Sequence, residues 1–552
     1  MVATANSEGF DVTGFSVISR MRFQDRLVSI LAVILGLAPL AVVAEGGAGS
    51  SFSRALAEAA STDETLAAHY QASNYADIWT GPDDADRRSA LFAALDGAAT
   101  HGLPAARYGA QSLRDSFQSA QTEGDRGRLE VALSAAYLSF ARDLSSGALT
   151  PAKVDPGIVR EIARPDPVAQ LQDIAAAENP AQLIADLVPS SPDYARLIKE
   201  KLRLEDVIAK GGWAEAISAK SLGPGDNGPA VITLRNQLIS RGYLAPTSVA
   251  SYEKTLTRAV QRFQLDSGIT ADGVAGPSTI DALNVPASDR LKSVIVALER
   301  LRWMGDTPRG TRHIWVNQPE FVARIVDNGR TTFQTRTVIG KNVEEQRSPE
   351  FSDEMEYMAI NPSWGVPRSI IVKEYLPLLQ RNRNAVGHLQ VVDGNGRVVP
   401  RGAVNFAAYS ASSFPFGLRQ PPSDGNALGK VKFMFPNKYN IYLHDTPAKN
   451  LFDHEVRAYS HGCIRLGDPI DFAHALLARQ SDDPKGFFQG KLDEKSESNV
   501  SLDQKVPVHL VYFTAFPTPR GQIGYLNDVY GRDARLFDAL IAAGVAMPGE
   551  QG

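Results

Sequence analysis

Residues 441–466 of the 552-residue chain read IYLHDTPAKNLFDHEVRAYSHGCIRL and contain its only cysteine, Cys463. Three of the nine histidines, His444, His454 and His461, fall within the twenty residues that end at this cysteine. A lone cysteine is most often a small buried hydrophobic residue, but a nearby base or cation turns its thiol into a nucleophilic thiolate. The glycine before the cysteine lets the backbone approach a substrate and turn its N–H groups outward, as an oxyanion hole requires. The stretch therefore predicts a cysteine nucleophile.

A metal site is the alternative explanation for several histidines around one cysteine. The spacings between His444, His454, His461 and His474 are 10, 7 and 13 residues, which match none of the usual compact ligand pairs. A structural zinc also normally recruits more than one thiolate. The sequence therefore predicts neither a metal site nor another cofactor.

The sequence on both sides of this stretch has the alternating pattern of β-strands. An Asp-Asn-Gly turn at 327–329 separates two such segments, which is a strong short-range signal of a β-hairpin. A second hairpin is predicted around 393–396, further strands over 431–435, 441–444 and 506–513, and a helix over 468–479. We therefore expect a mostly β catalytic domain over 312–532, followed by a C-terminal helix and tail over 533–552.

An insertion interrupts this domain at about 365–430. It holds eight Lys or Arg residues against three Asp or Glu, a formal charge of +5 in a chain whose total is −5. Apolar surface comes from Tyr375, Phe406, Tyr409, Phe414 and Phe416, and several glycines and prolines interrupt regular structure. These features predict a mobile lid that concentrates carboxylate-bearing substrates over the cysteine.

The first half of the chain has the composition and spacing of helical domains. The length favours three to four domains, and 43% hydrophobic with 22% charged residues is typical of globular proteins. An all-α scaffold is predicted over 49–215, where Ala and Leu recur at helical spacing. A Gly-Pro-Gly-Asp sequence at 223–226 marks a linker, and a small module of three short helices is predicted over 221–286.

The segment 1–48 predicts export from the cytoplasm. An apolar run of 17 residues over 27–43 follows three arginines and precedes small residues, the order of a signal peptide or an N-terminal anchor. The positive flank stays in the cytoplasm, so the rest of the chain is predicted to lie outside the inner membrane, either released by cleavage or anchored to that membrane. Met21 is an alternative start. The charge of −5 lacks the basic excess that nucleic-acid binding needs, so no nucleic-acid partner is expected.

Residues 441–447 and 460–466 resemble the signature of the L,D-transpeptidase (YkuD) catalytic domain. The stretches NPSWGVP at 361–367, NALGKVKF at 426–433 and GYLNDVYG at 524–531 are similar to the large YcbB-like subgroup of that family. The three-helix module resembles a peptidoglycan-binding module, and the helical region resembles the scaffold domain of the subgroup. The resemblance thus covers nearly all of the chain after the export segment.

The resemblance implies a periplasmic enzyme that joins the third residues of two peptidoglycan stem peptides in 3-3 cross-links. The donor stem acylates Cys463 with loss of its terminal D-Ala, and an acceptor amine then resolves the thioester. Carbapenems are implied as covalent inhibitors. The same acyl-enzyme resolved by water would make an L,D-carboxypeptidase or endopeptidase, and a third hypothesis is an inactive cell-wall-binding scaffold. The acceptor stays open between a stem peptide, a free D-amino acid and an outer-membrane protein.

The resemblance assigns the proton acceptor to His444 and its orientation to the backbone carbonyl of Asp445, whose side chain has no assigned role. From the residues alone His461 is a second candidate, although in an extended segment its side chain would project parallel to that of Cys463 and reach the sulfur poorly. We expect the N–H groups of Gly462 and Cys463 to bind the oxyanion. The expected substrate contacts are Tyr442, Ser460, His461, Arg465, Trp364 and Asn426. Arg465 is either a contact to a substrate carboxylate or part of a surface salt bridge.

Overall fold

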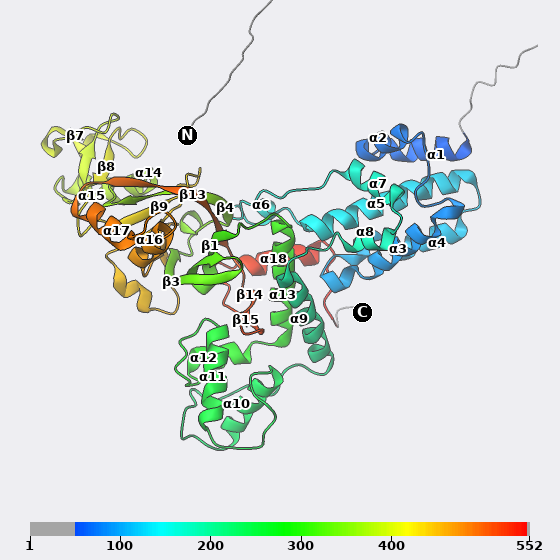
Figure 1. Cartoon of the computed structure of the whole chain (residues 1–552), viewed down its shortest axis with the longest axis horizontal. Helices are drawn as coiled ribbons and strands as arrows, with labels where there is room; N and C mark the ends of the chain where they lie inside the picture. Colours follow the sequence, from blue (N-terminus) through cyan, green and yellow to red (C-terminus); the bar gives the residue numbers. More distant parts are fainter. Residues whose placement is uncertain (1–49, 549–552) are drawn as a thin grey trace, which may run out of the picture. The chain divides into compact units, whose positions relative to one another are not determined.

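The computed structural model describes residues 50–548 (Figure 1). The predicted export segment over 1–48 and the last residues of the predicted tail lie outside the described residues. Within 50–548, no helix is both long enough and apolar enough to cross a membrane.

The first part of the described chain is all helical, as predicted. Its central helix α5 (Glu123–Ser146) begins at a capping box in which Thr122 and Asp125 satisfy each other's backbone N–H groups. The helix α1 (Ser51–Ala60) crosses α5 so closely that a Cβ atom at Gly127 would lie 2.5 Å from a carbonyl oxygen of α1. The other helices are α2 (Glu64–Ala72), α3 (Ala85–Asp96), α4 (Ala110–Ser119), α6 (Pro151–Val154), α7 (Pro167–Ala176), α8 (Pro180–Ala185) and α9 (Pro192–Ala209).

The predicted three-helix module follows and is confirmed as three helices with a core of their own. They are α10 (Pro229–Ser240), α11 (Lys254–Asp266) and α12 (Pro277–Asn284). Leu234, Val260 and Leu283, one from each helix, are completely buried in that core. The long helix α13 (Ala287–Met304) then leads into the β domain.

The β domain is built on one nine-stranded sheet in the order β11-β3-β12-β10-β9-β4-β13-β1-β2. Because β2 also pairs with β3, the sheet curls back on itself. The strands are β1 (Arg312–Asn317), β2 (Val322–Asp327), β3 (Arg330–Gly340), β4 (Phe351–Ile360), β9 (Val431–Met434), β10 (Leu443–His444), β11 (Ala458–Ser460), β12 (Ile464–Leu466) and β13 (Ser498–Val511). The mostly β fold predicted for this region is confirmed.

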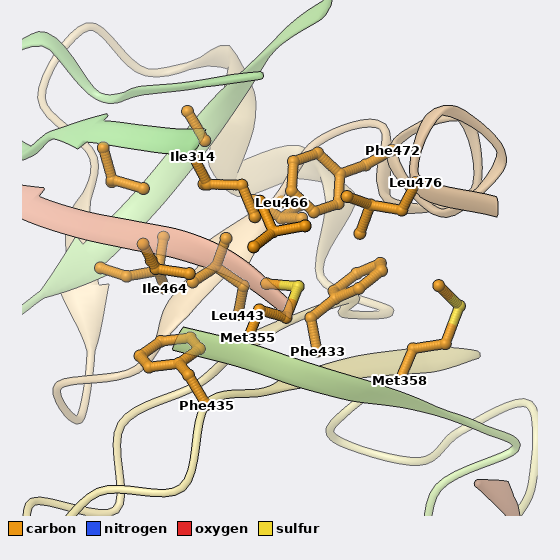
Figure 2. Close-up of a cluster of buried hydrophobic side chains, with 14 of the residues drawn as sticks. Ile314, Met355, Met358, Phe433, Phe435, Leu443, Ile464, Leu466, Phe472 and Leu476 are labelled. Carbon is orange, nitrogen blue, oxygen red and sulfur yellow. The ribbon is translucent and has the colours of Figure 1, made fainter. Parts of the chain in front are cut away.

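Local turn chemistry explains the predicted hairpin of β2 and β3. Asn328 and Gly329 have φ values of 49° and 76°, and two consecutive positive φ angles define the tight turn that Asn-Gly sequences favour. Behind the sheet, α16 (Pro469–Leu477) and α17 (Pro484–Asp493) supply core residues. Figure 2 shows Phe472 of α16 facing the sheet, where its ring meets that of Phe433 edge to face with centroids 4.9 Å apart.

The insertion over 365–430, the lid subdomain, is a folded unit rather than the irregular lid expected from its glycines and prolines. Its four-stranded sheet has the order β5-β8-β6-β7, and residues around Val391 and Leu418 form a separate buried core. Phe406 and Phe414 are buried in this core, so the prediction that they cap the substrate is wrong. The elements are β5 (Trp364–Gly365), α14 (Arg368–Ile370), a π-helical turn (Ile371–Tyr375), α15 (Leu376–Arg381), β6 (Gln390–Val392), β7 (Val398–Val399) and β8 (Gly417–Gln420).

The C-terminal part joins the β domain to α13 and to the helical scaffold. After a small hairpin, β14 (Ala515–Pro517) and β15 (Ile523–Tyr525), comes α18 (Arg532–Ala542). The guanidinium of Arg532 is fully buried, 3.4 Å from Glu350 and 3.5 Å from Asp155. It also donates a hydrogen bond to the carbonyl of Ser348 at 3.0 Å. A buried charge held by two carboxylates therefore fixes the segment around residue 350.

We expect Arg532→Met to lower the free energy of unfolding by about 3–5 kcal/mol, because it removes the fully buried cation that Glu350 and Asp155 share and leaves each carboxylate with one remaining partner, Arg300 and Arg535 respectively. Arg535→Met is the matched control, since Arg535 pairs with the same Asp155 but its side chain is 39% exposed; its loss should cost less than about 1 kcal/mol. Denaturant unfolding followed by intrinsic fluorescence measures both. Equal losses for the two variants would contradict this account of the cluster.

Candidate active site

A cavity of about 1180 Å³ lies where residues of the sheet and of the lid subdomain face each other. The pairing of β10 with β12 is parallel and places Leu443 opposite Ile464 and His444 opposite Arg465. The two motifs that carry the predicted chemistry therefore meet at this cavity. Its walls include most of the predicted site residues: Trp364, Tyr442, His444, Ser460, His461, Gly462, Cys463 and Arg465.

Cys463 precedes β12 and is partly buried. Its thiol donates a long hydrogen bond, 3.5 Å, to the carbonyl of Asn440. Burial raises the pKa of the thiol to about 11, while hydrogen bonds from Tyr442 and the charge of Arg465 oppose that rise. At neutral pH the resting cysteine is therefore a thiol and not a thiolate.

His444, at the end of β10, is buried with 4% of its surface exposed. Its Nδ1 makes a hydrogen bond to the backbone carbonyl of Asp445, and because a carbonyl only accepts, Nδ1 carries the proton. Burial lowers the pKa of His444 to about 3, and the positive charge of Arg465 adds to this effect. The ring is therefore neutral at neutral pH, with Nε2 free to accept a proton. Among residues 50–548, the thiol donates its proton to the carbonyl of Asn440 and not to this ring.

The side chain of Asp445, which the sequence left without a role, anchors the peptide that orients His444. One carboxylate oxygen accepts the N–H of Thr446 at 2.6 Å and the ammonium of Lys449 at 2.8 Å. The other accepts the N–H of Lys430 at 2.8 Å. A Cβ atom at position 429, where Gly429 has a φ of 63°, would collide with this carboxylate at 2.2 Å. Asp445 thus contributes twice, through its carbonyl and through its carboxylate.

The segment at 461–463 is bent rather than extended. Gly462 has a φ of 116°, so the expectation that the side chains of His461 and Cys463 project in parallel does not hold. His461 lies 2.7 Å through Nε2 from a carboxylate oxygen of Glu374, which belongs to the π-helical turn of the lid subdomain. The two histidines therefore differ in kind: His444 is buried and held by a carbonyl, whereas His461 is partly exposed and paired with a carboxylate.

Tyr442 and Arg465, two of the predicted substrate contacts, line the same cavity as the thiol. Tyr442 has a pKa raised well above its usual range by burial first and then by contact with Cys463. Arg465 lines the cavity, and among residues 50–548 its Nε is buried with no hydrogen-bond partner. Burial lowers its pKa. A guanidinium left without a carboxylate in a cavity suits the substrate-carboxylate alternative better than the surface salt bridge.

The prediction that Asn426 contacts substrate is wrong. Its side chain is completely buried, and its amide donates to the carbonyls of Pro362 and Pro421, both at 3.0 Å. Asn426 therefore ties together the two ends of the lid subdomain. The amide is used by the backbone just before the insertion and by the backbone near the C-terminal end of the insertion, which no local sequence pattern reveals.

Sequence reasoning missed several residues that shape the site. Glu374 pairs with His461, although 87 residues separate them. Ser348 donates a hydrogen bond to the carbonyl of Gly462 in the cysteine loop, and Tyr530 donates one to the carbonyl of Gly340 in β3. Their partners lie far away in sequence, so only the fold reveals them.

Comparison with known proteins gives three matched regions. Residues 64–200 match the scaffold domain, residues 227–283 match the "Putative peptidoglycan binding domain", and residues 311–489 match the L,D-transpeptidase catalytic domain, YkuD. A Haemophilus influenzae protein named "Putative L,D-transpeptidase" is 29% identical over 240 residues. That alignment covers 43% of this chain and 47% of the relative, so the chain spans about half the length of the curated relative that it matches.

Two solved structures are also similar. An L,D-transpeptidase from Xylanimonas cellulosilytica is 14% identical, covers 54% of this chain and all of its own, and has a TM-score of 0.16. An L,D-transpeptidase from Stackebrandtia nassauensis is 16% identical, covers 53% of this chain and 95% of its own, and has a TM-score of 0.22.

The raised pKa of Cys463 predicts how its reactivity depends on pH. Alkylation of the ligand-free chain by iodoacetamide should accelerate about tenfold per pH unit from about pH 7 to pH 10, because the thiolate fraction grows throughout this range. Intact-mass measurement of the single adduct follows the rate, and a small-molecule thiol with a pKa of about 8.5 serves as the control that levels off earlier. A rate that is already constant near pH 7 would instead indicate a preformed thiolate–imidazolium pair.

Proposed function

We propose that this protein forms 3-3 cross-links in peptidoglycan, because residues 311–489 match the L,D-transpeptidase catalytic domain, YkuD, in a chain that also matches a scaffold domain and a peptidoglycan-binding domain. The observation that carries the proposal is the shared cavity of Cys463 and His444, with the histidine neutral and its Nδ1 proton held by Asp445. The chemistry needed is acyl transfer through a thiol.

Acylation begins when the thiol turns from Asn440 toward His444 by rotation about its Cα–Cβ bond. The Nε2 atom of His444 takes the thiol proton while Sγ attacks the carbonyl that joins the third residue of the donor stem to its terminal D-Ala. The carbonyl oxygen becomes an oxyanion and accepts the N–H groups of Gly462 and Cys463. The C–N bond then breaks, the D-Ala nitrogen takes the proton from His444, and a thioester to Cys463 remains.

Deacylation follows the same steps, with an acceptor amine in place of the thiol as the attacking group. The acceptor amine attacks the thioester carbonyl and His444 takes the amine proton; the C–S bond then breaks, and the leaving thiolate recovers that proton from His444. Arg465 suits the binding of a stem-peptide carboxylate, because its guanidinium faces the cavity without a carboxylate partner of its own among residues 50–548. Attack by water would give the carboxypeptidase or endopeptidase outcome from the same thioester.

The proposal also covers the location of the protein and its binding partners. Peptidoglycan lies outside the cytoplasm, so the enzyme would act in the periplasm, in line with the export segment predicted over 1–48. The module around 227–283 would hold the polymer, and stem peptides and carbapenems would be the covalent partners of Cys463. The presence of both Cys463 and His444 argues against an inactive scaffold.

We expect Cys463→Ala and His444→Ala each to lower cross-linking about 1000-fold or more, because nucleophile and base act as a unit. His461→Ala should retain more activity, since His461 pairs with the lid subdomain. Purified protein is incubated with disaccharide-tetrapeptide, and mass spectrometry separates dimers from tripeptides and unchanged substrate.

Dimers in that assay would support transfer, whereas tripeptides alone would show a hydrolase. Unchanged substrate with the wild-type chain would contradict both enzymatic readings. A Cys463→Ala variant that retained more than a tenth of the activity would exclude Cys463 as the nucleophile.

The contacts between lid and cavity predict a difference between large and small acyl donors. Lys373 of the lid subdomain pairs with Glu345, beside the Glu374 to His461 contact. Lys373→Ala should lower peptide turnover about tenfold and weaken its salt dependence, while acylation by a small carbapenem changes by less than about twofold.

Arg383→Ala is the matched control for this experiment. It removes the same charge from an exposed position of the lid subdomain that does not line the cavity. Intact-mass and product analysis measure both reactions for both variants. Equal effects of the two substitutions would show that only the overall charge of the lid matters.

A further inference from the structure

Ser348 lies directly beneath the cysteine loop and is completely buried. Its hydroxyl oxygen accepts the N–H of Gly340 at 3.0 Å. Its hydroxyl proton goes to the carbonyl of Gly462, at 2.6 Å. Because the Gly340 N–H can only donate and the Gly462 carbonyl can only accept, the direction of both bonds is fixed, and Ser348 is the donor to that carbonyl.

This bond fixes the orientation of the peptide between Gly462 and Cys463. In a planar trans peptide the C=O and N–H bonds point in opposite directions, so a carbonyl held on one side aims the next N–H at the other. The N–H in question belongs to Cys463, and among residues 50–548 it donates to no protein acceptor. Both residues of the peptide line the cavity.

Little else restrains this peptide from within the loop. Gly462 has a φ of 116°, a region that glycine enters without strain and from which it can also leave easily. An unrestrained Gly462–Cys463 peptide could therefore rotate and carry the N–H of Cys463 away from the cavity. The restraint has to come from a neighbouring element, and Ser348 supplies it.

The backbone of Ser348 is itself fixed by hydrogen bonds through both its N–H and its carbonyl. Its N–H donates to the hydroxyl of Tyr530 at 3.3 Å, and its carbonyl accepts from Arg532 at 3.0 Å. The Tyr530 hydroxyl donates in turn to the carbonyl of Gly340 at 2.7 Å. A Cβ atom at Gly340 would lie 1.9 Å from the carbonyl oxygen of Gln346, so the β3 backbone and the Ser348 loop are in the closest contact that glycine allows.

We propose that Ser348 is the positioning residue of the oxyanion hole: its hydrogen bond to the Gly462 carbonyl holds the Cys463 N–H toward the reacting carbonyl. This inference rests on the proposed acyl transfer at Cys463. Ser348 would thereby act in the transition state without touching the substrate. Negative charge develops there on the carbonyl oxygen of the substrate, which accepts the N–H of Cys463.

The test compares two reactions of the same sulfur in the full chain. Acylation by a carbapenem passes through an oxyanion, whereas alkylation by iodoacetamide displaces iodide directly and forms none. Ser348→Ala should therefore slow acylation about 10- to 100-fold, short of the loss of about 100- to 1000-fold that follows removal of an oxyanion donor, and leave alkylation within about twofold. Intact-mass time courses measure both rates.

Two further comparisons separate positioning from general loosening of the loop. Tyr530→Phe removes the hydroxyl that accepts the Ser348 N–H but keeps the Ser348 to Gly462 bond, so acylation should fall less than in Ser348→Ala while alkylation stays within about twofold. Ser348→Thr and Ser348→Val have nearly the same shape, and only threonine retains the hydroxyl. Acylation should be faster in Ser348→Thr than in Ser348→Val at equal alkylation rates, and this pair also decides the question if Ser348→Ala does not fold.

Acylation of Ser348→Ala at the wild-type rate would overturn the proposal. So would a parallel fall of acylation and alkylation, because that pattern means a disordered loop. A wild-type chain that is alkylated but never acylated would overturn the proposed function together with this role, whereas a wild-type chain that is acylated normally leaves the function standing whatever Ser348 does.

Discussion

The parallel pairing of β10 with β12 is the constraint on which the candidate site depends. The two strands contribute only two and three residues, yet their register sets His444 beside Arg465 and brings the loop of Cys463 to the same cavity. Parallel neighbours need a long crossover, and the residues between the two strands supply it, with β11 pairing on β3 along the way. The core beneath these strands, around Phe433 and Phe472, keeps that register in place because a slip by one residue would expose it.

Where the signal is local, the sequence predicts this protein well. The hairpin at Asn328 and Gly329 follows from turn chemistry alone, and the helices follow from their periodicity. The lid subdomain differs from the predicted irregular lid because its strands are two to four residues long and pair across distant segments, so no local pattern shows that Phe406 and Phe414 share a core. Cys463 and His444 stood out through their motif. Glu374, Ser348 and the buried role of Asn426 did not, because their partners are fixed only by tertiary structure.

Burial shifts the pKa values of Cys463 and His444 in opposite directions. It raises the pKa of Cys463 and lowers that of His444, so each is held in its neutral form. A neutral imidazole with its Nδ1 proton committed to the carbonyl of Asp445 has a single free basic atom, which removes any choice of tautomer. In the proposed acyl transfer, the proton would move only when a substrate carbonyl is present to accept the electrons of the sulfur, and catalysis would depend on a base rather than on a preformed thiolate.

The neutral state of the Cys463 thiol also affects how readily this residue is oxidised. Peroxides and similar oxidants attack thiolates, and the ladder from sulfenic to sulfonic acid starts there. A chain with one cysteine has no second thiol with which to rescue a sulfenic acid as an internal disulfide. If Cys463 is the proposed nucleophile, the burial that keeps it protonated would make the resting protein a poor target for oxidants and would preserve the one thiol of the chain.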